Sequence, residues 1–445
     1  LRLVSDFFCP NTGGVETHIY YLAQCLIARG HAVVVVTHAY GRRKGIRYLS
    51  NNLKVYYLPF LVFYNGCILP TVYTTLPWIR YIFLRERIQF VHGHSSFSVL
   101  AHESMFHAQA MGIRTVFTDH SLFGFADASS ILTNKLLQFT LANCDHVVCV
   151  SHTSKENTVL RARLRPEKVS VIPNAVHCQS FTPNIKQFMN NPITIIIISR
   201  LVYRKGTDLL AAIIPEICQM HPDLRFIIGG DGPKRILLEE AREKHQLQER
   251  VSLMGTVPHN KVRDILVQGQ IFLNTSLTEA FCMAIVEAAA CGLHVVTTNV
   301  GGIPEVLPPA LVSLCDPNVN ALIGALDRSI CSYRWKKAEG NLPDLERQHK
   351  LLSQMYYWPN VAERTERVYL NILASTHDNP NLANKLKKYF RCGTLFGWFF
   401  IMITVINLIL LRVLELFQPN YSISTHYTEV EKRCAAKSRL NKKCY

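Results

Sequence analysis

Residues 193–199 read ITIIIIS, a run whose side chains are apolar on both faces of an extended chain. Such a run is typical of a central strand in a parallel sheet, where helices cover both faces. Helical segments separate it from further strand-like runs at 224–228, 251–254, 271–274, 294–298 and 311–314. This stretch therefore predicts a doubly wound α/β domain over residues 190–350.

The first part of the chain repeats this alternation. Helical segments such as 15–29 lie between strand-like runs at 32–37, 89–92, 114–118, 146–150 and 169–172. A polar stretch near 175–192 separates the two patterns. We therefore predict two Rossmann-like domains in tandem, the first at 1–180 and the second at 190–350.

The C-terminal part has a different composition. Residues 393–411, GTLFGWFFIMITVINLILL, carry no charge, and at about 1.5 Å per residue a helix of this length crosses a hydrocarbon core of about 30 Å. Basic residues precede it, so the positive-inside rule places the globular part in the cytosol and the short basic tail, 412–445, across the membrane. Residues 351–378 are expected to form a helix that packs back on the globular part. A second uncharged run, 55–79, contains prolines and predicts an interfacial segment or an ordinary loop and helix.

Composition narrows the function classes. Apolar residues make up 49% of the chain and aromatic residues 10%, which excludes a disordered chain. The net charge of +16 suggests an anionic partner. The 14 cysteines are scattered without a C-x-x-C motif, so we expect reduced thiols in a cytosolic domain.

Glycines follow two of the predicted strands. Gly13 and Gly14 open a helix, which places free backbone amides where a phosphate can approach. Gly230 and Gly232, within FIIGGDGPKR, allow a ligand ring to lie against the backbone. Tight strand–helix turns explain both motifs nearly as well.

Two cations follow the 193–199 strand. Arg200 and Lys205 flank the loop SRLVYRKG. This pair suits a diphosphate, because a guanidinium binds two oxygens and an ammonium acts as a point charge. Ligands of open α/β sheets bind beyond the carboxyl ends of the strands, so the position favours this function over a surface loop that pairs with acids.

Histidines end two strands of the first domain. His120, in TDHSLFG, can accept, donate or shuttle a proton, although a structural histidine is a serious alternative. His92 and His94 lack a third ligand at metal-binding spacing, so we predict no metal.

Two glutamates stand in the apolar stretch LTEAFCMAIVEAAACG, residues 277–292. We expect Glu279 in a loop and Glu287 in an early turn of the helix that follows. A carboxylate can accept hydrogen bonds from two neighbouring sugar hydroxyls, and helix-start amides can bind phosphate oxygens. For Glu287 the alternative is an acid that favours the helix dipole. The amides concerned belong to Phe281, Cys282, Met283 and Ala284.

Together these motifs resemble the retaining glycosyltransferases of the GT-B type, family 4, which have two facing Rossmann-like domains. The resemblance rests on Glu279-x7-Glu287, Arg200 with Lys205, GGDGP and the glycine loop at the N-terminus, and it covers about residues 1–375. The stretch EAFCMAIVEAAACGLHVVTTNVGGIPEVLP and the C-terminal apolar run narrow it to the family that starts glycosylphosphatidylinositol (GPI) synthesis.

The resemblance implies transfer of N-acetylglucosamine from UDP-GlcNAc to phosphatidylinositol at the endoplasmic reticulum membrane, within a multi-protein complex. The sequence contains no D-x-D motif, so a metal-bridged diphosphate is not indicated and we expect no cofactor. The first domain would bind the acceptor and the second the nucleotide sugar. By the same resemblance, Arg200 and Lys205 would hold the diphosphate, Glu287 the ribose and Glu279 the donor sugar. His120 would lie near the hexose and the acceptor.

The sequence leaves other functions open. One is another GT-B glycosyltransferase or a nucleotide-sugar epimerase on the same fold. A non-enzymatic alternative is an anionic-membrane or nucleic-acid binder, whose binding would fall steeply with salt; we expect no nucleic-acid partner. Many members of the family have glycine where this chain has Ala280 and Cys282, which tightens the backbone near the sugar.

Overall fold

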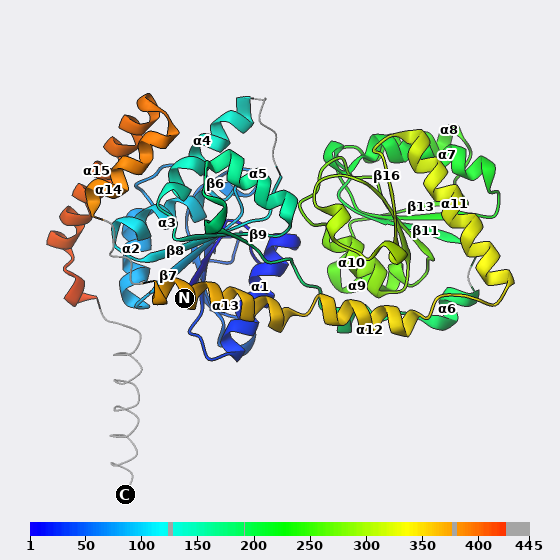
Figure 1. The fold of residues 1–445 in the computed structure, drawn as a ribbon, viewed down its shortest axis with the longest axis horizontal. Coiled ribbons are helices and arrows are strands. Elements are labelled where there is room, and N and C mark those ends of the chain that lie inside the picture. The colour runs from blue at the N-terminus through cyan, green and yellow to red at the C-terminus, as the bar shows by residue number, and fades with distance from the viewer. Residues whose placement is uncertain (123–127, 191, 376–380, 424–445) are drawn as a thin grey trace, which may run out of the picture. The chain divides into compact units, whose positions relative to one another are not determined.

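The computed structural model describes residues 1–122, 128–190, 192–375 and 381–423. They form two compact units (Figure 1). The first unit contains 1–149, 155–170 and the chain from 362 onward, and the second contains 150–154 and 171–361. Residues 171–192, predicted to end the first domain and to form a linker, therefore belong to the second unit, where Val176 and Phe181 are buried.

An eight-stranded sheet forms the centre of the first unit in the described residues, in the order β10-β9-β8-β7-β1-β2-β4-β3. Neighbouring strands from β9 to β4 run parallel, and β3 is antiparallel to β4. The strands are β1 (Arg2–Val4), β2 (Val34–His38), β3 (Gly45–Tyr48), β4 (Lys54–Leu58), β7 (Phe90–His94), β8 (Arg114–Asp119), β9 (His146–Cys149) and β10 (Val169–Val171).

Helices accompany this sheet, and most of them connect its parallel strands. The last long helix in the globular part, α13, belongs to this unit from Ala362 onward, and there the Tyr369 hydroxyl contacts Nδ1 of His92 at 2.7 Å. The helices are α1 (Gly14–Ala28), α2 (Leu76–Arg85), α3 (Val99–Ala110), α4 (Ala128–Ala142), α5 (His152–Ala162), α13 (Trp358–Ala374) and α14 (Leu382–Lys387).

The second unit contains a six-stranded parallel sheet in the order β13-β12-β11-β14-β15-β16. The isoleucine run forms β11, where Ile195 and Ile196, on opposite faces, are both fully buried. This confirms its predicted place as a central strand. The strands are β11 (Thr194–Ile198), β12 (Arg225–Gly229), β13 (Val251–Gly255), β14 (Ile271–Asn274), β15 (His294–Thr298) and β16 (Val312–Cys315).

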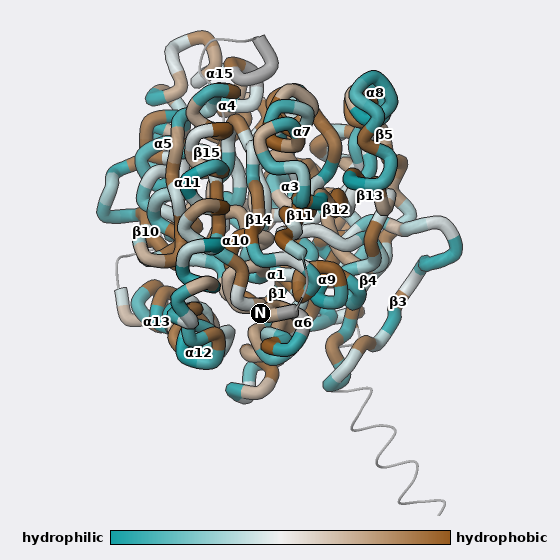
Figure 2. Tube along the Cα trace, turned by 90° about the vertical axis from the view of Figure 1, so that its right-hand side faces the viewer, coloured by the Kyte–Doolittle hydropathy of each residue, from teal (hydrophilic) through white to brown (hydrophobic). Residues whose placement is uncertain are grey.

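Helices cover both faces of this second sheet (Figure 1). The tube in Figure 2 is largely brown, hence apolar, along β11 and β12, whereas the exposed helices α8 and α12 carry long hydrophilic stretches. The helices are α6 (Ile185–Asn190), α7 (Thr207–Met220), α8 (Arg235–Lys244), α9 (His259–Leu266), α10 (Met283–Ala290), α11 (Val319–Ala338) and α12 (Leu345–Met355).

The predicted membrane segment forms helix α15 (Thr394–Phe417), which extends six residues beyond the predicted end at 411. With a mean hydropathy of 2.3 it is long and apolar enough to cross a membrane by length and composition. Its outward side exposes large apolar side chains, among them Leu395, Trp398 and Phe417.

The opposite side of α15 packs on the first unit along its length. Near its start, the ring of Phe400 stacks on that of Phe139 with the centroids 4.4 Å apart. In its middle, Oδ1 of Asn407 contacts Nδ1 of His107 at 3.0 Å. Just past its end, Arg80 donates a hydrogen bond of 2.8 Å to the carbonyl of Gln418.

The uncharged run 55–79 is more regular than predicted. It includes most of β4, then a hairpin of β5 (Val62–Tyr64) and β6 (Cys67–Ile68), and finally the start of α2. The hairpin exposes apolar side chains, with Leu61 70% and Phe63 72% exposed. These short strands were not predicted, because polar and aromatic residues alternate there without a clear apolar face.

Candidate active site

The exit loops of β11 and β14 are locked together in the second unit. These strands are parallel neighbours, so their carboxyl ends meet at the same edge of the sheet. The single proton of the Thr275 hydroxyl is shared between the carbonyls of Lys205 (2.9 Å) and Gly206 (3.0 Å), and the amide of Leu277 donates to the carbonyl of Arg204 at 2.9 Å. These hydrogen bonds fix the exit loop of β11 against that of β14.

The locked loops bring Lys205 and Glu279 into an ion pair, in which Nζ donates to Oε1. The Ser276 hydroxyl donates to the same oxygen at 3.0 Å. The Lys205 side chain is 23% exposed and that of Glu279 is 14% exposed. Burial acts to lower the pKa of Lys205, but the Glu279 carboxylate outweighs it, so the pKa lies above the usual value. The lysine is therefore a permanent cation at the edge of the sheet.

Arg200 lies on the same loop and is exposed. Its positive charge acts on Lys205 and opposes the effect of Glu279 on the lysine pKa. The two cations are therefore near enough to interact, as the sequence predicted for a diphosphate site. An anion that bound both of them would relieve this repulsion.

Glu287 is buried in α10, with 7% of its surface exposed. Burial raises the pKa of its carboxyl to about 7, and no described neighbour lowers it again. Glu287 lies beyond the first turn of α10, which contains no acid. The dipole effect falls off within the first turn of a helix, so it does not account for this carboxyl.

Helix α10 begins as predicted, one residue after Cys282. Cys282 adopts the left-handed region with φ 63° and ψ 82°. The first amides of a helix have no partner within the helix, so those of Met283 and Ala284 are donors at the same edge as Lys205. Phe281 is buried and packs edge-to-face on Tyr356, with the ring centroids 5.7 Å apart.

Cys282 offers a test of backbone strain. The left-handed conformation costs a residue with a Cβ about 1–2 kcal/mol, whereas glycine adopts it freely. We expect Cys282→Gly to be more stable than Cys282→Ala by about 1 kcal/mol, because both remove the thiol and one keeps the Cβ. Thermal unfolding of the two variants measures this difference, and equal melting temperatures would contradict it.

Gly230 and Gly232 allow the neighbouring loop to approach closely. Gly230 has φ 142° and Gly232 has φ 156°. A Cβ added at Gly230 would collide with the carbonyl oxygen of Ser199, and one at Gly232 with that of Leu201. The close approach of the β11 exit loop therefore explains both glycines, which favours the turn interpretation.

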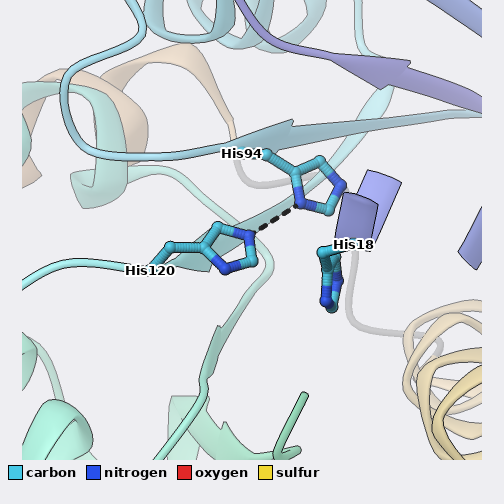
Figure 3. A group of neighbouring side chains, drawn as sticks. All are labelled: His18, His94 and His120. Carbon is cyan, nitrogen blue, oxygen red and sulfur yellow. Dashed lines mark hydrogen bonds between the residues drawn. The ribbon is translucent and has the colours of Figure 1, made fainter. Parts of the chain in front are cut away.

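Three histidines converge in the first unit (Figure 3). His18 comes from α1, His94 from the end of β7, and His120 directly follows β8. One ring nitrogen of each lies within 4.8 Å of the others, and Nδ1 of His94 is 3.3 Å from Nε2 of His120. Burial, and then neighbouring imidazoles, hold the pKa of His120 and His94 well below the usual value. These rings are therefore neutral at physiological pH.

The fold supplies the third histidine that a metal site beside His94 would need and that the sequence did not show. No third ligand was visible beside His92 and His94, but the fold brings His18 and His120 to His94. The hydrogen bond between His94 and His120 uses a proton on one of the two nitrogens, and both would have to be free of protons to bind a metal. His18 was missed, although its place one helical turn after Gly14 was a usable signal.

Two neighbours of the cluster have structural roles. His92 uses both ring nitrogens, since Nε2 contacts the Thr118 hydroxyl at 2.7 Å in addition to the tyrosine contact described above. Asp119 is fully buried beside Arg161, with Nη1 and Oδ2 3.4 Å apart and both side chains 0% exposed. It also accepts hydrogen bonds from the hydroxyls of Ser96 and Thr158, at 2.8 and 2.9 Å.

The glycine loop opens α1 as predicted. Gly13 is the N-cap with an extended backbone, and Gly14 is the first helical residue. Both are exposed, so the first amides of α1 are accessible. The predicted residues thus fall into two groups: Gly13, Gly14 and His120 in the first unit, and the cations, the glutamates and the α10 start in the second.

Known proteins share this arrangement of elements. Residues 38–127 match the family model described as PIGA (GPI anchor biosynthesis), and residues 179–334 match glycosyl transferases group 1. A solved structure of sucrose-phosphate synthase from Thermosynechococcus elongatus superposes with a TM-score of 0.70 at 19% identity, covering 84% of this chain and 99% of that one. The two α/β units and the matched family model define a glycosyltransferase of the GT-B type.

Two full-length relatives specify the family. Each is named as a subunit of phosphatidylinositol N-acetylglucosaminyltransferase. The relative from Homo sapiens is 57% identical over 420 residues, covering 94% of this chain and 85% of that protein. The relative from Arabidopsis thaliana is 52% identical over 423 residues, covering 95% and 92%. The chain belongs to this family, which acts in GPI-anchor synthesis and whose members are named as subunits of a larger enzyme. This favours the transferase over the epimerase and the non-enzymatic binder.

Proposed function

We propose that this chain moves N-acetylglucosamine from UDP-GlcNAc to phosphatidylinositol with retention of the anomeric configuration. The observation that carries the site assignment is the ion pair of Lys205 and Glu279 on the joined exit loops of β11 and β14. The relatives, which are named as subunits of phosphatidylinositol N-acetylglucosaminyltransferase, support the sugar and the lipid.

The cations act on the leaving group. Departure of UDP builds negative charge on the β-phosphate, and Arg200 and Lys205 stabilise that charge more in the transition state than in the ground state. A diphosphate would take over part of the interaction that Lys205 makes with Glu279, which frees the carboxylate to accept hydrogen bonds from the donor sugar. Attack on the face that UDP vacates gives retention.

Glu287 is assigned to the ribose. Burial raises the pKa of its carboxyl to about 7, so the free protein disfavours the ionised form more than an exposed glutamate does. Two donated hydroxyl hydrogen bonds favour the ionised form, so we expect the donor to lower this pKa. His120, neutral and next to His94 and His18, can accept or donate a proton near the acceptor.

A labelling assay tests the reaction. Membranes that contain the full complex, given radiolabelled UDP-GlcNAc, should label phosphatidylinositol, and the product should have the anomeric configuration of the donor by NMR. Glu279→Ala should lose most of this label, whereas Glu249→Ala, at an exposed position of the same unit, should keep it. A label on a lipid without inositol would refute the acceptor. Equal labelling by both variants would refute the site.

Metal removal is a separate test. We expect the initial rate to be unchanged by EDTA, because Arg200 and Lys205 supply the positive charge that a metal ion would otherwise provide. Rates before and after chelation, with Mg²⁺ or Mn²⁺ added back, measure this. A loss that a metal restores would contradict the prediction, and His18→Ala would then show whether the histidine cluster holds the ion.

We also propose a single-pass topology, with the catalytic units in the cytosol and the tail in the lumen. Basic residues before α15 and its apolar outward side support it. A glycosylation site appended after the last residue, Tyr445, should then be modified in the lumen. Absence of the glycan, together with cleavage of the tail by an externally added protease, would reverse this orientation.

A further inference from the structure

Two basic segments that are far apart in the sequence meet in the first unit. One lies after α5 and contributes Arg165 and Lys168; the other is the 3-10 helix Lys388–Cys392. Arg165, Lys168 and Lys388 line two adjoining cavities, the larger of about 340 Å³. Neither segment belongs to the candidate active site.

The cavities are rich in positive charge. Asp145 is the carboxylate among the lining residues, and it is already engaged by Arg114 at 3.0 Å and by the amide of Thr115 at 2.8 Å. Within the described residues, none of the other lining cations has a carboxylate within ion-pair distance. These cations are Arg163, Arg165, Lys168, Lys385, Lys388 and Arg391.

Backbone carbonyls are the partners that the structure shows for several of these cations. Nζ of Lys168 donates to the carbonyl of Cys144 at 3.4 Å, and Nζ of Lys385 donates to that of Gln109 at 3.4 Å. Burial, followed by the charges of Lys168 and Arg391, lowers the pKa of Lys388. Several cations therefore lie close together, and the hydrogen bonds that Lys168 and Lys385 make to neutral carbonyls are long. A bound anion would reduce the repulsion among these cations.

The cavities lie away from the transferase chemistry of this unit. Strand β8 begins at Arg114, which lines the larger cavity, and His120 directly follows its other end. Six strand residues at about 3.3 Å each separate the two edges by roughly 16–20 Å. The basic cavities are therefore at the amino-terminal edge of the sheet, whereas the histidine cluster is at the carboxyl edge.

The start of α15 is directly beside the cavities. Arg391 and Cys392 line the smaller cavity, and α15 begins at Thr394. Nζ of Lys135 holds the carbonyl of Cys392 at 2.7 Å, which fixes this turn on the unit. Where an apolar helix enters a bilayer, the phosphates of the lipids lie at the level of its first residues.

We propose that these cavities bind the phosphate-bearing head group of an anionic phospholipid, in the leaflet at which α15 begins. Guanidinium and ammonium groups recognise such a head group through its phosphate oxygens. This lipid is distinct from the acceptor, since its site is at the opposite edge of the sheet. It orients the first unit on the membrane.

Lipid binding to the purified full chain in neutral detergent tests this proposal, with native mass spectrometry as the readout. The probes are phosphatidylserine and phosphatidylcholine. The test variant is Lys168→Gln with Lys388→Gln. Its matched control is Lys336→Gln with Lys337→Gln, at exposed positions near the end of α11. Each basic residue near an anionic lipid increases the binding affinity about fivefold. The test variant lacks two of them, so it should bind phosphatidylserine about 25-fold more weakly than wild type.

The control should bind like wild type, and phosphatidylcholine should bind weakly to all three proteins. Unchanged thermal unfolding shows that the test variant is folded. The proposal is overturned if the test variant holds phosphatidylserine as tightly as the control, or if wild type does not distinguish the two lipids. It is also overturned if excess glycerol phosphate displaces phosphatidylserine, because the site would then serve a soluble phosphate compound.

Discussion

Replacing Lys205 by methionine should lower the turnover number about 10²–10³-fold, the usual effect of removing one preorganised group that stabilises charge in the transition state. Methionine keeps much of the length of the side chain but not the charge that faces the leaving diphosphate. Turnover should fall more than donor affinity, because the lysine acts most strongly on charge that develops during the reaction. Initial rates over a range of UDP-GlcNAc concentrations separate the two effects.

The matched control is Lys244→Met, at an exposed position in the last turn of α8. It removes the same charge from the same unit and should leave turnover unchanged. Lys205→Arg should retain part of the activity, since a guanidinium still offers charge to the phosphate. If Lys205→Met turned over at the wild-type rate, the cation at this position would have no role in the chemistry, and the ion pair with Glu279 would be structural.

Replacing Asp119 by alanine should destabilise the first unit by about 3–5 kcal/mol, because it leaves the buried guanidinium of Arg161 without its carboxylate. The hydroxyls of Ser96 and Thr158 would lose their acceptor as well. For a unit of this size, such a loss lowers the melting temperature by roughly 10 °C. Thermal unfolding of the purified chain measures it.

The double variant Asp119→Ala with Arg161→Met separates this cause from other damage at the site. It removes both buried charges, so it should recover much of the lost melting temperature. Activity per folded molecule should change less than stability, since Asp119 faces Arg161 rather than the reacting groups. No change in melting temperature for Asp119→Ala would show that the carboxylate contributes nothing to stability.

Sequence periodicity predicted the parallel framework well. The isoleucine run of β11 and the strands around it lie within two residues of their predicted bounds. This succeeds because a buried parallel strand must be apolar on both faces. The same reasoning missed the hairpin of β5 and β6, whose short strands expose Phe63 and Tyr64.

The sequence predicted the loops that carry the candidate site residues, but not how these residues interact with their neighbours. Sequence position suggested that Glu279 had the weaker structural explanation and Glu287 the stronger. The structure reverses this order, because Glu279 pairs with Lys205 while Glu287 is buried beyond the first turn of α10. Similarly, His18 is distant from His120 in the sequence, and only the fold brings the two side chains together. Periodicity identifies an element, but it does not say which side chains from distant elements meet.

The packing of α15 has a practical consequence for work on the isolated enzyme. A chain truncated before Thr394 would be expected to be water-soluble, yet it would uncover the apolar surface around Phe139 and leave the buried His107 without its Asn407 partner. Expression and crystallisation trials should therefore retain α15 and use a detergent. The apolar helix α15 therefore also covers part of the apolar surface of the first unit.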